Sequence, residues 1–133
     1  VQTKGNDGCH LILRGSKKGP NFDAVSVQGV CEKLEQNGLN LSVMVDCSHG
    51  NSAKDHRKQP TAAKAVAAQI AGGSRFVMGV MLESHLIEGQ QSYKGDGSDT
   101  YGQSITDACI SWEQTIPVLE ELAGAVRQRR SLS

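Results

Sequence analysis

The sequence predicts an α/β fold in which parallel strands alternate with helices. Three short apolar runs begin at residues 9, 41 and 76, and a helical pattern follows each of them. Repeats of this length are typical of a parallel sheet with crossover helices. Each run ends at polar residues that can carry chemistry, namely Arg14, the segment 46–49 and Glu83. Functional side chains of parallel α/β folds gather at the carboxyl ends of the strands, so these residues are the candidate site.

The first strand–helix unit joins a strand at residues 9–13 to a helix that begins at Asn21 or Asp23 and runs to about Asn37. Asparagine and aspartate are good N-caps, and Gly38 follows where a left-handed residue is wanted. The apolar side chains of this helix recur at helical spacing: Val27, Val30, Cys31 and Leu34.

The second unit joins a strand at residues 41–45 to a polar stretch, 49–59, and then a helix with Pro60 in its first turn. Gly72 and Gly73 end this helix. Its side chains expected to be buried are Ala63, Val66, Ala67 and Ile70.

The third strand, 76–82, precedes a stretch with little periodicity, 84–113. Loops of that length are uncommon in compact domains unless they are functional. A last helix is expected to start near residues 115–117, with this buried stripe: Leu119, Leu122, Ala123 and Val126.

The whole chain, residues 1–133, is interpreted as part of one domain. Three β-α units cannot close an eight-stranded barrel, and the chain begins directly before a strand. We therefore expect the C-terminal three β-α units of a larger (β/α)8 TIM barrel. A complete small α/β protein is the alternative.

Charge and composition disfavour several classes of protein. The chain has 14 basic and 14 acidic side chains, so it lacks the basic excess of a nucleic-acid-binding domain. No apolar stretch approaches a membrane span, and no signal-peptide pattern is present, so we expect no membrane partner. The four cysteines form no CxxC pair, which favours reduced thiols and a cytoplasmic location.

His49, Glu83 and Asp107 form the candidate metal set. An imidazole nitrogen with carboxylate oxygens suits a divalent first-row ion such as Mn²⁺, Fe²⁺, Co²⁺ or Zn²⁺. The three residues are too far apart for a local motif, so they converge only if the strands are neighbours and the long loop returns Asp107. The alternative is a loop histidine, a solvated glutamate and a helix-capping aspartate.

Three other residues near this set have simpler interpretations. His85 would share a face with Glu83 if the strand continued, which makes it an alternative ligand. Cys47 has the same relation to His49, but a small buried apolar residue is the better interpretation. His56 lies in a charged run, 54–58, and is expected to be solvated.

Arg14 ends a strand that is expected to be buried, and it precedes a loop rich in glycine and lysine. A guanidinium there can bind a phosphate or carboxylate through two parallel hydrogen bonds. A structural ion pair with a neighbouring carboxylate is the alternative. Lys17 and Lys18 are interpreted as surface charges.

Four segments of the chain resemble one enzyme family. They are Leu13-Arg14-Gly15, then VDCSHGNS at 45–52, GVMLESH at 79–85 continuing to Glu88-Gly89, and YGQSITDACISWE at 101–113. In this order they are similar to the C-terminal part of type I 3-deoxy-D-arabino-heptulosonate 7-phosphate (DAHP) synthase. That family opens the shikimate pathway to chorismate and the aromatic amino acids.

The resemblance implies a (β/α)8 barrel whose sixth to eighth strands and helices come from this chain. It also implies a metal-dependent, aldol-like condensation of phosphoenolpyruvate with erythrose 4-phosphate. His49, Glu83 and Asp107 match metal ligands, and Arg14 matches an arginine that holds the phosphate of phosphoenolpyruvate. We therefore expect catalytic roles for His49 and Arg14, and substrate binding by Arg14, His49 and Asp107. Cys47 replaces an aromatic residue usual in the family, a change expected to affect packing.

Other family features have no match in this sequence. The fourth metal ligand of the family is a cysteine near the start of the barrel, and a Lys-Pro-Arg-Thr segment binds erythrose 4-phosphate. We therefore expect that the chain needs the N-terminal part of the barrel as a partner and is inactive alone. The full-length enzyme is expected to be a homo-oligomer. The alternatives are a non-catalytic fragment and a small α/β binding module.

Overall fold

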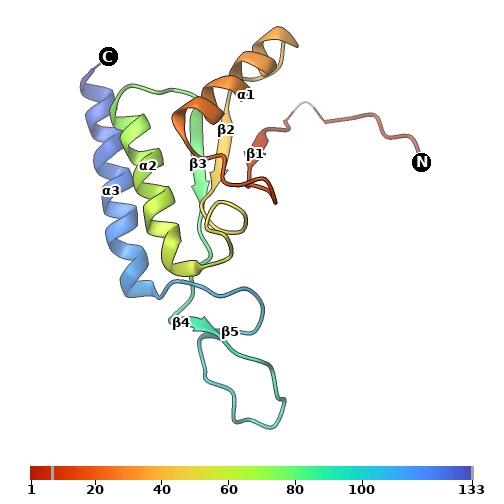
Figure 1. Ribbon diagram of the computed structural model, residues 1–133, viewed down its shortest axis with the longest axis vertical. Helices are drawn as coiled ribbons and strands as arrows, with labels where there is room; N and C mark the ends of the chain where they lie inside the picture. The colour runs from red at the N-terminus through yellow and green to blue at the C-terminus, as the bar shows by residue number, and fades with distance from the viewer. Residues whose placement is uncertain (7, 133) are drawn as a thin grey trace.

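A three-stranded parallel sheet organises the chain in the computed structural model, which describes residues 1–6 and 8–132 (Figure 1). The strands are β1 (Leu11–Leu13), β2 (Val43–Asp46) and β3 (Val77–Met81), with β2 in the middle. Both pairings are parallel, so the three carboxyl ends lie at one edge of the sheet. This confirms the expected β-α order.

Three helices accompany the sheet: α1 (Ala24–Gln36), α2 (Gln59–Ala71) and α3 (Trp112–Ser131). Figure 1 shows α2 and α3 side by side along one side of the sheet, and α1 across its upper part. None of the helices in the described part of the chain has both the length and the apolarity to cross a bilayer.

The predicted starts of the first two helices are confirmed. Asp23 caps α1 by accepting a hydrogen bond from the Ser26 amide at 2.9 Å, and Gly38 has a φ of +64° just after the helix. Pro60 stands in the first turn of α2, where its missing N–H leaves no hydrogen bond unmade. A 3₁₀ turn, η1 (His56–Lys58), leads into α2.

The core lies between the sheet and the helices. Side chains of β2, α1 and α2 form its centre, and the predicted stripe of α2 is buried as expected: Ala63, Val66, Ala67 and Ile70. Of the stripe predicted for α1, Val27 and Cys31 are buried, while Val30 and Leu34 are partly buried at the margin.

The first strand is shorter than predicted. It covers Leu11–Leu13, and of its side chains only Leu13 is buried. Leu11 and Ile12 are exposed. Arg14 therefore follows a strand at the edge of the sheet and not a buried one.

The start and the buried face of α3 differ from the prediction. The helix begins at Trp112, because Ser111 and Gln114 form a capping box, and Pro117 lies inside it. The side chains that it buries are Thr115, Val118 and Ala125, with Leu122 and Val126 partly buried. Leu119 and Ala123 are exposed, because they lie on a neighbouring stripe turned away from the core.

The segment after β3 has more structure than its lack of periodicity predicted. It holds β4 (Ile87–Gln90) and β5 (Gln103–Ser104), which pair in a small second sheet. Figure 1 shows this sheet beyond the carboxyl ends of β2 and β3. The segment then returns to β3, because Ile110 donates its N–H to the Glu83 carbonyl and accepts from His85, both at 3.0 Å.

Candidate metal and anion site

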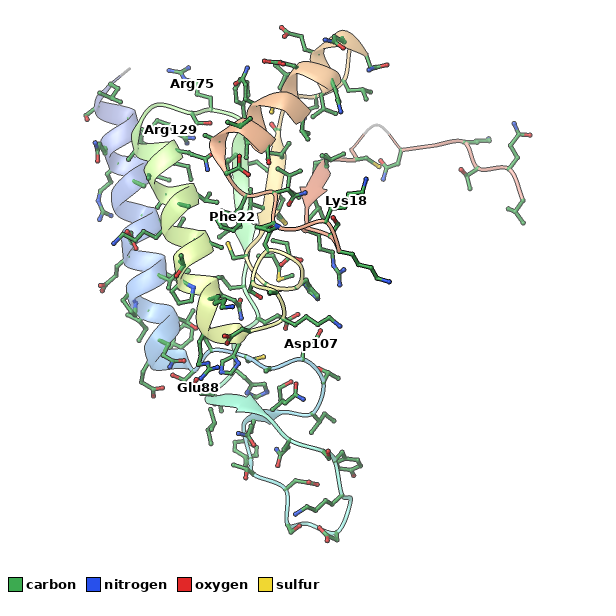
Figure 2. The ribbon with its side chains drawn as sticks, in the orientation of Figure 1. Lys18, Phe22, Arg75, Glu88, Asp107 and Arg129 are labelled. Atoms are coloured by element: carbon green, nitrogen blue, oxygen red, sulfur yellow. The ribbon has the colours of Figure 1, made fainter. Side chains whose placement is uncertain are left out.

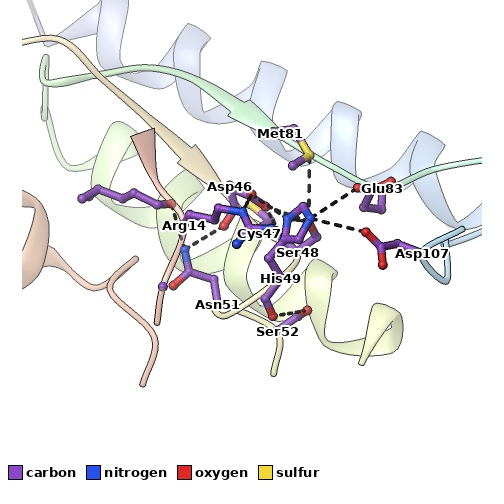
Figure 3. Close-up of polar contacts among 12 residues, drawn as sticks. Arg14, Asp46, Cys47, Ser48, His49, Asn51, Ser52, Met81, Glu83 and Asp107 are labelled. Carbon is purple, nitrogen blue, oxygen red and sulfur yellow. Dashed lines mark hydrogen bonds and ion pairs between the residues drawn. The ribbon is translucent and has the colours of Figure 1, made fainter. Parts of the chain in front are cut away.

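The carboxyl edge of the sheet carries the predicted metal set, as Figure 3 shows. His49 follows β2, Glu83 follows β3, and Asp107 lies on the returning segment. One ligand atom from each of the three residues lies within 4.8 Å of the others. The predicted convergence of these side chains is therefore present, and the long segment does bring Asp107 back to the strand ends.

His49 is the centre of this cluster. Its Nε2 atom lies 3.5 Å from Asp107 Oδ2 and 3.8 Å from Glu83 Oε1, while its Nδ1 atom lies 2.7 Å from Asp46 Oδ2. The backbone of His49 has a φ of +46°, a left-handed conformation that is uncommon for a residue with a side chain. The tight turn after β2 thus directs the ring across the strand ends.

These residues fit a divalent cation. Two carboxylates and one imidazole nitrogen face one point, and they are the ligand types that Mn²⁺, Fe²⁺, Co²⁺ and Zn²⁺ accept. A metal-binding histidine usually donates its other N–H to a carboxylate, as His49 can to Asp46. We call His49, Glu83 and Asp107 the metal cluster.

A buried glutamine fixes the backbone beside the second ligand. Gln59 is fully buried at the start of α2. Its Oε1 accepts the N–H of Glu83 at 2.8 Å, and its Nε2 donates to the carbonyl of Glu83 at 3.1 Å. Gln59 therefore pairs with both backbone groups of Glu83, as a residue of a neighbouring strand would.

Arg14 lies next to the metal cluster but outside it. Its Nε atom is 3.9 Å from Asp46 Oδ2, and its side chain is 62% exposed. Figure 3 shows Asp46 between Arg14 and His49. The guanidinium thus has one long contact with a carboxylate, and solvent surrounds the rest of it. This geometry agrees with both the anion-binding and the ion-pair interpretations of Arg14.

A cavity of about 300 Å³ opens at the metal cluster. Besides the three cluster residues it is lined by Lys54, His56 and Gln90, among others. Arg14 does not line it. The cavity joins the turn after β2, the start of α2 and the segment that carries Asp107.

The prediction that His56 is solvated was wrong. Its Nε2 atom lies 2.8 Å from Glu88 Oε1, and its side chain is only 17% exposed. Glu88 also accepts from Gln114 at 2.9 Å, and these two hydrogen bonds lower the pKa of its carboxyl. Figure 2 shows Glu88 near the starts of α2 and α3, where these contacts join β4 to η1 and α3.

The other two residues considered near the metal cluster lie outside it. His85 is exposed, and its Nδ1 accepts the N–H of Leu86 at 2.7 Å. Cys47 is fully buried and packs among apolar side chains. Burial, with the neighbouring Asp46 carboxylate, raises the pKa of its thiol to about 12. All four cysteines of the chain are free thiols.

Sequence reasoning missed Gln59 as a site residue, and it missed the role of Asp46, although Asp46 lies in the candidate segment 46–49. Asp46 lies in the VDCSHGNS segment at 45–52, but nothing in the spacing indicated that it would contact His49. Gln59 stood in a polar stretch with no pattern of its own. Both act through contacts that only the folded chain creates.

Comparisons with known proteins point to one family. The DAHP synthetase I family model matches residues 1–120. A putative phospho-2-dehydro-3-deoxyheptonate aldolase of Schizosaccharomyces pombe is 53% identical over 98% of this chain and 36% of its own length. A phospho-2-dehydro-3-deoxyheptonate aldolase of Haemophilus influenzae is 52% identical, with the same shares covered.

A solved structure gives the same result. The phospho-2-dehydro-3-deoxyheptonate aldolase of Francisella tularensis aligns with a TM-score of 0.89 and 46% identity, over 96% of this chain and 37% of that protein. The chain thus spans little more than a third of the length of the relatives that it matches. With most of its residues matched by the family model, this chain belongs to the DAHP synthetase I family.

Proposed function

We propose that this chain supplies the metal ligands and one substrate-binding arginine of a DAHP synthase. The observation that supports this most directly is the convergence of His49, Glu83 and Asp107 at the carboxyl edge of a parallel sheet, in a member of this family. These three residues would hold a divalent cation, which would supply Lewis-acid activation of the aldehyde oxygen of erythrose 4-phosphate.

The residues of this chain then have separate roles. Arg14 binds the anionic groups of phosphoenolpyruvate through charge-assisted hydrogen bonds and holds carbon 3 in position for attack. His49 presents Nε2 to the cation and Nδ1 to Asp46. His49 and Asp107 both line the cavity at the cluster, where we propose that they contact the substrates.

The proposed reaction joins two phosphorylated substrates. Carbon 3 of phosphoenolpyruvate forms a bond to the aldehyde carbon of erythrose 4-phosphate. Water adds at carbon 2 of the phosphoenolpyruvate moiety, the bond to the phosphate oxygen breaks there, and inorganic phosphate leaves. The products are DAHP and phosphate, so phosphate release measures turnover.

We further propose that residues 1–133 form the C-terminal part of a single (β/α)8 barrel domain. The parallel order β1-β2-β3 and the family membership support this assignment. The N-terminal part of such a barrel is the required partner, and a homo-oligomer is expected for the full-length enzyme. The four free thiols support a cytoplasmic location.

The test combines this chain with the N-terminal part of a homologous enzyme. We expect phosphate release that requires both substrates and a divalent cation, and that a chelator abolishes. His49→Ala, Glu83→Ala and Asp107→Ala should each reduce turnover by at least a hundredfold, because each removes a ligand.

His85→Ala is the matched control, since His85 is an exposed histidine two positions from Glu83 and outside the metal cluster. Its turnover should equal that of the unchanged chain. Chelator-resistant turnover, or equal losses for His85 and His49, would contradict the proposed function.

A further inference from the structure

A buried carboxylate joins the two parts of the proposed site. Asp46, at the end of β2, is only 2% exposed. Its Oδ1 atom accepts from the Ser48 amide at 2.8 Å and from the Ser48 hydroxyl at 2.7 Å. Its Oδ2 atom lies 2.7 Å from His49 Nδ1 and 3.9 Å from Arg14 Nε. Both oxygens are therefore engaged, and each has a different neighbour.

These contacts determine where the His49 ring carries its proton. The Ser48 hydroxyl also lies 2.7 Å from His49 Nδ1 and has only one hydrogen to donate. If that hydrogen pointed to Nδ1, the ring nitrogen and Asp46 Oδ2 would face each other at 2.7 Å with lone pairs alone. If Nδ1 carries the proton, it donates to Asp46 Oδ2 and the Ser48 hydroxyl donates to Oδ1. The first arrangement leaves two of the three short contacts without a hydrogen. In the second, the Nδ1 hydrogen is shared between Asp46 Oδ2 and the Ser48 oxygen, so each of the three contacts contains one.

From this network we infer that Asp46 is a positioning residue that selects the His49 tautomer with the proton on Nδ1. That tautomer leaves a lone pair on Nε2, the atom that faces Glu83 and Asp107. A histidine binds a metal only through a nitrogen without a proton, and the bond from its other nitrogen sets the ring orientation. The inference rests on the proposed metal site but concerns the metal-free chain as well.

Asp46→Asn is the informative substitution, because it keeps the size of the side chain. The two hydrogen bonds from Ser48 require an acceptor at the Oδ1 position, so the amide oxygen of the asparagine is held there. The amide N–H₂ then faces His49 Nδ1 and donates to it. We therefore expect the His49 proton to move to Nε2, the nitrogen that a metal needs.

The experiment uses two readouts on the purified protein labelled with ¹⁵N on histidine. Long-range ¹H–¹⁵N spectra, recorded without metal and with the ring neutral, report which His49 nitrogen carries the proton. We expect Nδ1 in the unchanged chain and Nε2 in Asp46→Asn. Titration with Co²⁺, followed by visible absorption, should show binding weakened at least tenfold in Asp46→Asn.

Asp23→Asn is the matched control. It makes the same chemical change at the cap of α1, away from the metal cluster, and asparagine also caps helices well. We expect the His49 tautomer and the Co²⁺ affinity to be unchanged in this variant.

The two readouts separate the inference from the proposed function. A proton on Nε2 in the unchanged chain overturns the inference, and this spectrum decides whether or not Asp46→Asn folds. An unchanged tautomer and affinity in a folded Asp46→Asn protein overturn it too. If the unchanged chain has the Nδ1 proton but does not bind Co²⁺, the proposed metal site is wrong while the role of Asp46 stands.

Discussion

Arg14 is the residue that we propose binds phosphoenolpyruvate and not erythrose 4-phosphate. Replacing it by alanine removes a charge-assisted hydrogen-bond pair to a bound anion, which is worth roughly 1.5 to 3 kcal/mol. In the assembled enzyme, Arg14→Ala should weaken phosphoenolpyruvate binding about ten- to a hundredfold and leave erythrose 4-phosphate binding nearly unchanged. Titration of each substrate separately measures both affinities.

Lys18→Ala is the control for Arg14→Ala, since Lys18 is an exposed cation in the loop that follows Arg14. It should affect neither affinity. Equal losses for both substrates in Arg14→Ala would show that the arginine supports the structure as the ion-pair partner of Asp46.

Gly15 makes the close approach that places Arg14 beside the turn after β2. Its φ is +69°, and an added Cβ would lie 2.5 Å from the Gly50 carbonyl carbon and 2.6 Å from the Asn51 nitrogen. Both contacts are with backbone, which cannot move aside cheaply. Gly15→Ala should therefore lower the free energy of unfolding by more than about 1 kcal/mol in urea denaturation.

Gly29→Ala tests whether this loss is specific. Gly29 lies within α1 and an added Cβ meets nothing within 4 Å. This substitution should raise the free energy of unfolding by about 0.4 to 1 kcal/mol, because alanine loses less backbone entropy on folding. A destabilisation of the same size as that of Gly15→Ala would contradict the close-approach argument.

At the scale of elements, the cap of α1 makes stability depend on pH. Hydrogen bonds from the side chain and backbone of Ser26 lower the pKa of Asp23 below 3.8. A carboxyl with a lowered pKa stabilises the fold fully above its unfolded value, and this contribution is lost as the pH falls through the folded value. Asp23→Ala should therefore cost about 1 kcal/mol at neutral pH.

This cost should shrink as the pH falls below 3.8. Urea denaturation of both proteins at neutral and acidic pH measures the difference. Asp23→Asn keeps the cap without a titrating carboxyl, so its own capping contribution should not vary with pH. A constant difference between the unchanged chain and Asp23→Ala would refute the assignment of this pH dependence to the cap.

The elements with local signals were predictable from the sequence. Both α1 and α2 combine a helical apolar stripe with a cap or a proline at the start. The sequence predicts the start of α3 too late, near residues 115–117, although the pair Ser111 and Gln114 is itself a capping-box pattern. β4 and β5 pair across a long segment with little alternation, so no local pattern marks them.

Some residues of the candidate site were likewise predictable from the sequence, and others were not. His49 and Glu83 follow strands, so the carboxyl-end rule for parallel sheets identified them. Asp107 belongs to this set only if the long segment returns to the strand ends, and the family resemblance indicates the same residue. The contacts of His56 with Glu88 and of Gln59 with Glu83 join elements distant in sequence. Such contacts depend on how helices and loops pack, which residue spacing does not encode.

At the scale of the whole molecule, the number of metal ligands and substrate contacts in the chain decides what it can do by itself. Three ligands are present, and within the described residues no cysteine belongs to the cluster. The family resemblance implies a fourth ligand and a Lys-Pro-Arg-Thr segment for erythrose 4-phosphate, and neither has a match in this sequence. Under the proposed function, the chain therefore contributes three metal ligands and one phosphate contact, fewer of each than the resemblance implies for the whole enzyme.

We accordingly expect the 133-residue chain alone to release no phosphate from the two substrates. Loss of phosphate contacts and of a ligand acts on the same transition state, and about 1.4 kcal/mol of lost stabilisation already slows a reaction tenfold. Adding the N-terminal part of a homologous enzyme should restore turnover and tighten Co²⁺ binding together, because one partner supplies both missing features.

The assay needs chain purified from a host without DAHP synthase, and Glu83→Ala in the same mixture as the background. Turnover by the unmixed chain above that background would contradict the prediction. Restored turnover without tighter Co²⁺ binding would mean that the partner adds substrate contacts but no ligand.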